Sequence, residues 1–210
     1  MLRAAKGFLK DKDPHEIAAS ANVSFDRNDS AFYLDTLGKT VRVSYPDYEF
    51  EEVSSTTGSQ NGKSQSGDLS LLGEWHRLVI LHYLNHADGT PVGNGQITIG
   101  EMKDGLIRGG NFDRQVEAMI RRQLGNCDPE AVKTACKRLG GRSVDTKADL
   151  CAVFPFLPNC PVTMNVWFAD EEMEGSGRLL LDKSADHYLT VEDAVTVGTI
   201  ILDALFHDLC

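Results

Sequence analysis

The spacing of hydrophobic residues changes along the chain, and each spacing predicts a different type of secondary structure. Apolar and polar residues alternate over residues 40–45, which is typical of a strand with one buried face. Residues 31–35 have the composition of a preceding strand, so the two segments predict a hairpin. Between residues 68 and 87, apolar positions recur every three or four residues and Asp88-Gly89 supplies a stop. We expect this helix to be central to the core, with Trp75 buried.

Other helices are indicated by their first residues. Aspartate precedes proline at Asp13-Pro14 and Asp128-Pro129, where the acid can cap a helix and the proline suits its first position. Thr190, with Asp193 three residues later, starts the last helix in a similar way. We expect Gly109 and Gly110 to lie in a loop. The expected helices cover residues 13–22, 111–124, 129–139 and 190–205.

Most of the remaining strand candidates lie in the last third of the chain. Prolines 155, 158 and 161 confine bends to the strand ends. Strands and helices segregate instead of alternating, which favours an α+β fold over a parallel sheet. We predict a single α+β domain over residues 1–210, with a mixed, mostly antiparallel sheet and helices packed on it. The candidate strands cover residues 96–99, 151–156, 162–168 and 178–181.

Residues 54–67 form the clearest break in composition. The segment has no apolar residue and contains three glycines and many hydroxyl groups. Such a composition cannot bury enough surface to become ordered by itself. A domain linker is one interpretation, but the preceding segment is too short for a core of its own, so we expect a flexible surface loop.

The charge balance limits the possible partners. The formal net charge is −10, from 31 acidic and 21 basic residues. An acidic surface disfavours nucleic acids and anionic membranes, which bind clustered lysine and arginine. The densest basic group alternates with acids and is best interpreted as a solvated helix face. It comprises Arg121, Arg122, Lys133, Lys137, Arg138 and Arg142.

The cysteines and the start of the chain predict a reduced, cytoplasmic setting. Five cysteines are an odd number, and the charged first residues leave no apolar signal core. Cys127/Cys136 and Cys151/Cys160 are each separated by eight residues, which is wide for zinc or iron–sulfur ligand pairs. We therefore expect buried, unmodified thiols. The dinucleotide, P-loop, zinc-protease, serine-hydrolase and C-x-x-C motifs are all absent.

Two groups of residues could nevertheless carry chemistry. His82 and His86 are four apart, so one helix face could present both to a metal ion, although a partly buried structural pair is the plainer interpretation. A second group follows two strands near the C-terminus, where acids and a histidine could bind a cation or transfer protons. An acidic, solvated turn is its plainer interpretation. The candidate ligand-binding residues are Trp167, Asp170, Glu171, Glu172, Asp182, His187 and Tyr188.

The same C-terminal stretch resembles the DUF3786 family. Residues 167–172 (WFADEE) resemble a W-x-x-D-E-E motif, and residues 181–185 (LDKSA) resemble an F/L-D-x-S-A motif. Residues 187–193 (HYLTVED) are similar to Y-L-P-T-E-D, with Val191 present and the motif proline lacking. The likeness extends back through residues 81–84 and 139–141 and covers nearly the whole chain.

This resemblance implies a context and supplies no catalytic residues. The family comprises uncharacterised bacterial and archaeal domains, many from anaerobes, and some relatives carry a cysteine-rich iron–sulfur segment. Our leading hypothesis is therefore a non-catalytic accessory domain in anaerobic metabolism, binding a small ligand, a metal-bearing cofactor or a protein partner, for example an iron–sulfur or other cofactor-bearing protein. One alternative is an enzyme of unrecognised type, and another is a metal-binding protein using His82 and His86. Convergence of Asp182, His187 and residues 170–172 on one pocket would favour the enzyme.

Overall fold

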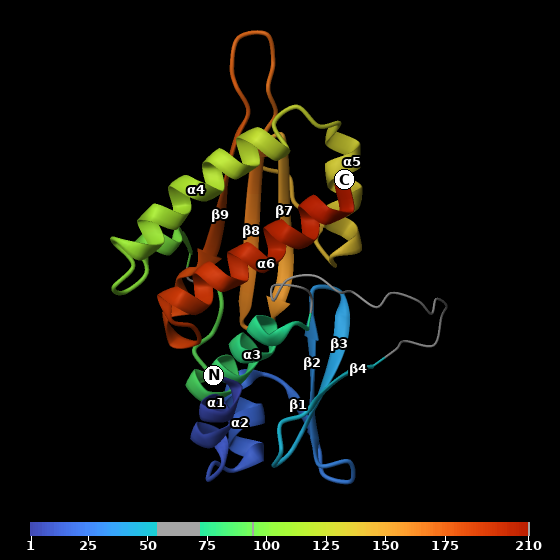
Figure 1. Ribbon diagram of the computed structural model, residues 1–210, viewed down its shortest axis with the longest axis vertical. Coiled ribbons are helices and arrows are strands. Elements are labelled where there is room, and N and C mark those ends of the chain that lie inside the picture. The colour runs from blue at the N-terminus through green and yellow to red at the C-terminus, as the bar shows by residue number, and fades with distance from the viewer. Residues whose placement is uncertain (54–71, 94, 210) are drawn as a thin grey trace.

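Two antiparallel sheets and six α-helices make up the protein in a computed structural model that describes residues 1–53, 72–93 and 95–209 (Figure 1). A four-stranded sheet has the order β1-β2-β3-β4, and a five-stranded sheet has the order β5-β9-β8-β7-β6. The predicted α+β fold is confirmed, with the strands divided between two sheets. The strands are β1 (Ser24–Asp26), β2 (Ala31–Thr36), β3 (Lys39–Ser44), β4 (Phe50–Val53), β5 (Gln96–Ile97), β6 (Arg142–Ser143), β7 (Leu150–Leu157), β8 (Cys160–Trp167) and β9 (Ser176–Asp182).

Five of the six α-helices form two groups, and α5 packs against α6 and β7. In Figure 1, α4 and α6 cross one face of the five-stranded sheet, while α1, α2 and α3 lie beside the four-stranded sheet. Two short 3₁₀ helices, η1 (Ile99–Glu101) and η2 (Lys183–His187), precede α4 and α6. The α-helices are α1 (Leu2–Leu9), α2 (Pro14–Ala21), α3 (Glu74–His86), α4 (Arg108–Gln123), α5 (Pro129–Arg138) and α6 (Val191–Leu209).

Local sequence signals placed most of these elements correctly. The predicted hairpin is β2–β3, with Leu34 opposite Val41. Asp13 and Asp128 cap α2 and α5 through hydrogen bonds from backbone N–H groups, and a proline follows each. The prediction of a loop at Gly109 and Gly110 was wrong, because both lie inside α4. The predicted flexible loop at residues 54–67 falls outside the described residues.

The helix predicted as central, α3, is buried on more sides than its pattern indicated. It contacts α1, α2 and α6, so its apolar residues are distributed around the axis. Trp75 is only half-buried, and His76 next to it is fully buried. The prediction of a buried Trp75 was therefore wrong, while the apolar residues in the middle of the helix do enter the core: Leu78, Val79, Ile80, Leu81, Tyr83 and Leu84.

The two sheets are joined where the β2–β3 turn meets β7 and the end of α5. The Leu37 N–H donates a hydrogen bond of 3.1 Å to the Pro155 carbonyl. Gly38 and Gly140 both adopt positive φ, at 77° and 73°. A Cβ atom on Gly140 would lie 2.7 Å from the Gly38 nitrogen, so glycine is required for this backbone contact.

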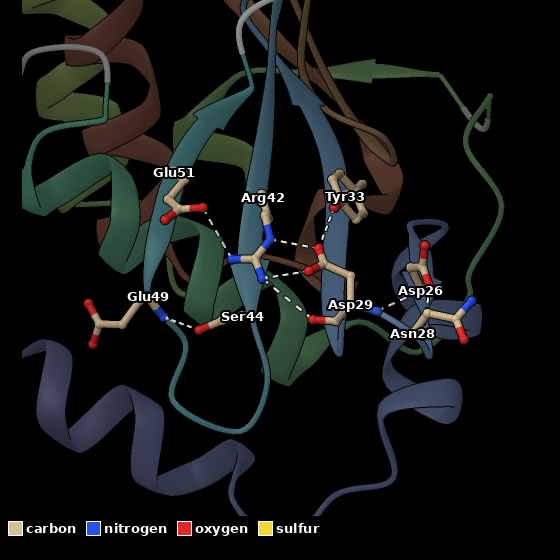
Figure 2. Close-up of polar contacts among 8 residues, drawn as sticks. All are labelled: Asp26, Asn28, Asp29, Tyr33, Arg42, Ser44, Glu49 and Glu51. Carbon is tan, nitrogen blue, oxygen red and sulfur yellow. Dashed lines mark hydrogen bonds and ion pairs between the residues drawn. The ribbon is translucent and has the colours of Figure 1, made fainter.

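An ion-pair network crosses the outer face of the four-stranded sheet (Figure 2). Arg42 donates two hydrogen bonds to the Asp29 carboxylate, of 2.7 and 3.0 Å, one of 3.4 Å to the Asp29 carbonyl and one of 3.2 Å to Glu51. Tyr33 also donates a short hydrogen bond to Asp29. Mainly because of Arg42, the pKa of Asp29 falls to about 2. The charge of Arg42 is thus compensated by acids on both sides.

No helix within the described ranges is long and apolar enough to cross a membrane.

Candidate functional site

The acids predicted to act together lie at opposite ends of β9. Asp170, Glu171 and Glu172 occupy the exposed turn between β8 and β9, the orange loop at the top of Figure 1. The Asp170 carboxylate accepts hydrogen bonds from the N–H groups of Glu172 and Met173, at 2.9 and 2.7 Å, which lower its pKa. Asp182 ends β9 and pairs with Gln96 of β5. The structure therefore does not bring these acids together.

Asp182 and His187 each have a structural partner at their end of the sheet. Asp182 accepts hydrogen bonds from the Gly93 N–H at 2.9 Å and from the Ser184 hydroxyl at 2.7 Å. The His187 Nδ1 lies 2.7 Å from an Asp88 oxygen, and this contact is the main reason that the pKa of Asp88 falls to about 2. These contacts attach the segment after α3 to β9 and η2.

Tyr188 belongs to a buried polar network. Its hydroxyl donates to the Thr90 carbonyl and accepts a 3.0 Å hydrogen bond from the Asn159 side chain. Its ring stacks on Tyr83 with the centroids 5.5 Å apart. The Tyr83 hydroxyl in turn donates to the Ala21 carbonyl at 2.6 Å and accepts from the Asn159 N–H at 3.1 Å. A fully satisfied network of this kind fixes the packing of the elements that it joins.

Trp167 is the last residue of β8, at the strand end where the turn with the exposed acids begins. Its indole N–H donates to the Lys147 carbonyl at 3.4 Å. The Arg178 guanidinium lies 5.5 Å from the ring centroid, within the range of a cation–π contact. Asn165, two residues earlier on β8, has a buried side-chain oxygen with no hydrogen-bond partner in the described structure.

His82 and His86 do lie together, and the structure adds an acid that the sequence pattern did not connect to them. Their ring centroids are 5.9 Å apart, and the His82 Nδ1 is 2.7 Å from an oxygen of Asp193. Asp193 was identified only as part of a helix start, and it does accept hydrogen bonds from Thr190. The Asp193 contact raises the pKa of His82, and burial lowers that of His86.

A long trough, which we call the α4 trough, runs along the exposed side of α4. It consists of two open clefts of 850 and 550 Å³ that share Gln115 and Ala118. Four arginines line it, and Glu174 is the one acid in its lining within the described residues. The arginines are Arg108, Arg114, Arg121 and Arg122.

The charge of the α4 trough is poorly compensated. Arg121 makes a 3.4 Å ion pair with Glu174, although both side chains are largely exposed. Arg108, Arg114 and Arg122 have no ion pair within residues 1–53, 72–93 and 95–209. The trough thus presents a positive surface on a chain whose formal net charge is −10.

Two large apolar side chains stand at the start of the α4 trough. Leu106 is 84% exposed and Ile107 is 77% exposed. The backbone before them is fixed: the Ile99 and Gly100 N–H groups donate to Asp113, at 3.2 and 2.8 Å. We call Leu106 and Ile107 the apolar tip. Adjacent exposed hydrophobic residues on a fixed backbone are typical of an interaction site.

The α4 trough was not predicted from the sequence, for a geometric reason. Arg121 and Arg122 are close in sequence to the basic residues of the next helix, whereas in the folded protein they lie with Arg108 and Arg114 on one side of α4. The spacing of the arginines along one helix was the signal that could have predicted the trough. It was not recognised because the start of α4 was expected to be a loop.

A second cleft, of 690 Å³, lies between β2 and β7. Val153, Pro155 and Pro161 contribute apolar surface, and Asp35 and Arg142 contribute one charge of each sign. Its volume is within the usual range for small-molecule sites. In contrast to the α4 trough, it has no excess of one charge.

Comparisons with known proteins identify the family of the chain. The model of a family described as a domain of unknown function (DUF3786) matches residues 13–204 of the 210-residue chain. No curated protein and no solved structure matches.

Proposed function

The chain belongs to the DUF3786 family, whose description assigns no activity, and we propose from its structure that it is a non-catalytic binding domain for an acidic protein partner. The partner docks along the α4 trough and receives the apolar tip in a pocket of its own. The observation that carries this proposal is the row of four arginines, of which only Arg121 has an ion pair within the described residues, on an otherwise acidic protein. A protein partner is one of the three classes of ligand expected from the sequence, beside a small ligand and a metal-bearing cofactor.

The separation of the other candidates favours binding over catalysis. Asp182 and His187 are each engaged in structural contacts, and residues 170–172 lie at the far end of β9. General acid–base catalysis needs such groups within hydrogen-bond reach of one substrate atom. The distance between these candidate residues supports an accessory role. The cytoplasmic, anaerobic setting and the cofactor-bearing partner remain predictions.

Charge and apolar contact have different roles in this docking. Arginine guanidinium groups can form paired hydrogen bonds with carboxylates, so they favour aspartate and glutamate on the partner. Burial of the apolar tip adds about 1.5–3 kcal/mol for each side chain that is fully removed from water. We therefore expect an acidic segment with apolar residues to bind, and binding to weaken as salt screens the charges.

The test uses a short fluorescent peptide in which glutamates surround leucines at three- and four-residue spacing. We expect it to bind the protein and expect Arg108→Glu together with Arg114→Glu to weaken binding by about 30-fold, because two ion pairs of about 1 kcal/mol each are lost. Fluorescence anisotropy at several salt concentrations measures the effect. Leu106→Ser should also weaken binding, but without reducing the salt dependence.

The matched control is Arg3→Glu together with Arg142→Glu, which makes the same change in net charge at exposed arginines outside the trough. We expect this variant to bind the peptide nearly as well as the unmodified protein. Equal losses in the two double variants would mean that bulk charge drives binding and would overturn the proposal. Binding to anionic lipid vesicles in place of the peptide would overturn it as well.

A further inference from the structure

His82 is held in one orientation by an acid from a different helix. It lies on α3, and its Nδ1 is 2.7 Å from Oδ1 of Asp193 near the start of α6. Asp193 is only 4% exposed, and its other oxygen accepts 2.7 and 3.1 Å hydrogen bonds from the hydroxyl and N–H of Thr190. An ionised Asp193 accepts a hydrogen bond from the Nδ1–H group, which leaves Nε2 of His82 as the nitrogen whose lone pair is available to a ligand.

His86 lies one helical turn further along α3. Its ring centroid is 5.9 Å from that of His82, and the two rings are inclined by 32°. The His82 side chain is 29% exposed and His86 is exposed, so solvent reaches both rings. His86 has no hydrogen bond in the described part of the chain, so its ring can rotate toward the fixed His82.

We propose that His82 and His86 together bind a divalent transition-metal ion such as Zn²⁺ or Ni²⁺, with Asp193 orienting His82 from the outer sphere. Neutral imidazole suits these ions, and two histidines four apart on a helix can chelate one ion at about 2.0–2.1 Å from each nitrogen. A carboxylate that accepts the other N–H of a ligating histidine is the usual second-shell partner of such sites. The site does not depend on the α4 trough.

The protein supplies only part of the coordination shell. The described residues contain no group of three or more histidine, cysteine, aspartate or glutamate side chains arranged to hold a metal ion. Water occupies the remaining positions, so the ion is exchangeable and open to a further ligand. Such a site fits reversible metal binding better than a permanent structural metal.

One nearby cation opposes metal binding. The Lys12 ammonium donates a 2.6 Å hydrogen bond to the Asn85 carbonyl, next to His86. The positive charge of Lys12 repels a divalent ion bound at this ring. Removal of the Lys12 charge should therefore strengthen the binding of a divalent ion.

The experiment titrates untagged, full-length protein with Zn²⁺ and Ni²⁺ by isothermal calorimetry. Co²⁺ serves as a spectroscopic probe, because its visible absorption reports nitrogen coordination directly. We expect one ion per chain. His82→Gln and His86→Gln should each weaken binding by at least about tenfold, because the remaining imidazole cannot chelate. Asp193→Asn should weaken it by about 10–100-fold and Lys12→Gln should strengthen it.

The chain contains a matched control pair. His187 and Asp88 have the same 2.7 Å Nδ1–carboxylate contact as His82 and Asp193, but His187 has no histidine one turn away. His187→Gln and Asp88→Asn should leave metal affinity unchanged. Thr190→Ala is a second control, because it removes the hydroxyl bond to Asp193 and keeps the His82 contact.

The outcomes separate the alternatives clearly. A loss of affinity in Thr190→Ala equal to that in Asp193→Asn would show that Asp193 acts only through the start of α6, and would overturn its outer-sphere role. Unchanged affinity and unchanged Co²⁺ absorption in both His82→Gln and His86→Gln, with folding confirmed by circular dichroism, would overturn the metal site itself.

Discussion

Gly109→Ala and Gly110→Ala are expected to change the stability of the protein in opposite directions. A Cβ atom on Gly109 would lie 2.3 Å from the Ile99 carbonyl oxygen and 2.8 Å from the Gly100 nitrogen. Both atoms are backbone and cannot move aside as a side chain could. We expect Gly109→Ala to lower the free energy of unfolding by about 1–3 kcal/mol, the usual range for overpacking.

Gly110 is the neighbouring residue of α4 and has nothing within 4 Å of the position of a Cβ atom. Alanine there meets no clash and reduces the conformational freedom of the unfolded chain. We expect Gly110→Ala to raise the free energy of unfolding by up to about 1 kcal/mol. Urea unfolding of the two variants, followed by circular dichroism, measures both effects.

The same pair tests whether the apolar tip is held in place by this packing. Gly109→Ala pushes the start of α4 away from η1, so we expect it to weaken the binding of the acidic peptide although no charge is changed. Gly110→Ala should leave that binding intact. Equal stability changes in the two variants would contradict the close contact between Gly109 and Ile99.

The fold was predictable where a single short segment determines the structure. The caps at Asp13 and Asp128 and the β2–β3 hairpin depend on residues within a few positions of each other, and all three are present. Local rules failed at Gly109, because glycine there allows close contact with Ile99 of η1, which helix propensity does not take into account.

The candidate site was less predictable because it depends on contacts between distant segments. The pattern gave His82 and His86, but their acid is Asp193, 111 residues from His82. Asp182 and residues 170–172 show the opposite case. They are close in sequence and were predicted to act together, but the full length of β9 separates them in the structure. The periodicity of the sequence predicts which residues share a face of one helix or strand. Which helices and strands contact each other depends on tertiary packing, which periodicity does not predict.

The contacts of His76 also join segments that are distant in sequence, and they lead to a prediction of how the stability of the protein depends on pH. It is fully buried, with its Nδ1 accepting a 3.1 Å hydrogen bond from the Leu72 N–H and its Nε2 lying 2.9 Å from the Thr36 hydroxyl. Its ring stacks on Phe156 of β7, with centroids 4.9 Å apart. Neutral His76 therefore connects α3 to both sheets.

Burial, with a smaller contribution from Lys39, lowers the pKa of His76 from 6.5 to about 4. Above pH 6.5 the imidazole is neutral in the folded and the unfolded chain, so stability does not depend on its titration. Between pH 6.5 and 4 the unfolded chain binds a proton that the folded protein does not. The free energy of unfolding should therefore fall by about 1.4 kcal/mol per pH unit, or about 3 kcal/mol in all.

The other groups with shifted pKa values affect stability differently from His76 between pH 6.5 and 4. Asp29 and Asp88 have pKa values of about 2 in the folded protein against a usual 3.8, so their contribution is lost only below pH 3.8. The raised pKa of His82 stabilises the fold fully below pH 6.5 and less above it. His86 has a lowered pKa and acts in the same direction as His76, but its ring is exposed.

We expect His76→Gln to be less stable than the unmodified protein at neutral pH and to lose most of the decline in stability between pH 6.5 and 4.5. Glutamine keeps polar contacts in this position but does not titrate, so the slope disappears while the buried site stays satisfied. Urea unfolding at a series of pH values measures the slope, and His15→Gln, at an exposed histidine, should retain it. A full decline in His76→Gln would mean that protonation of His76 does not limit stability in acid.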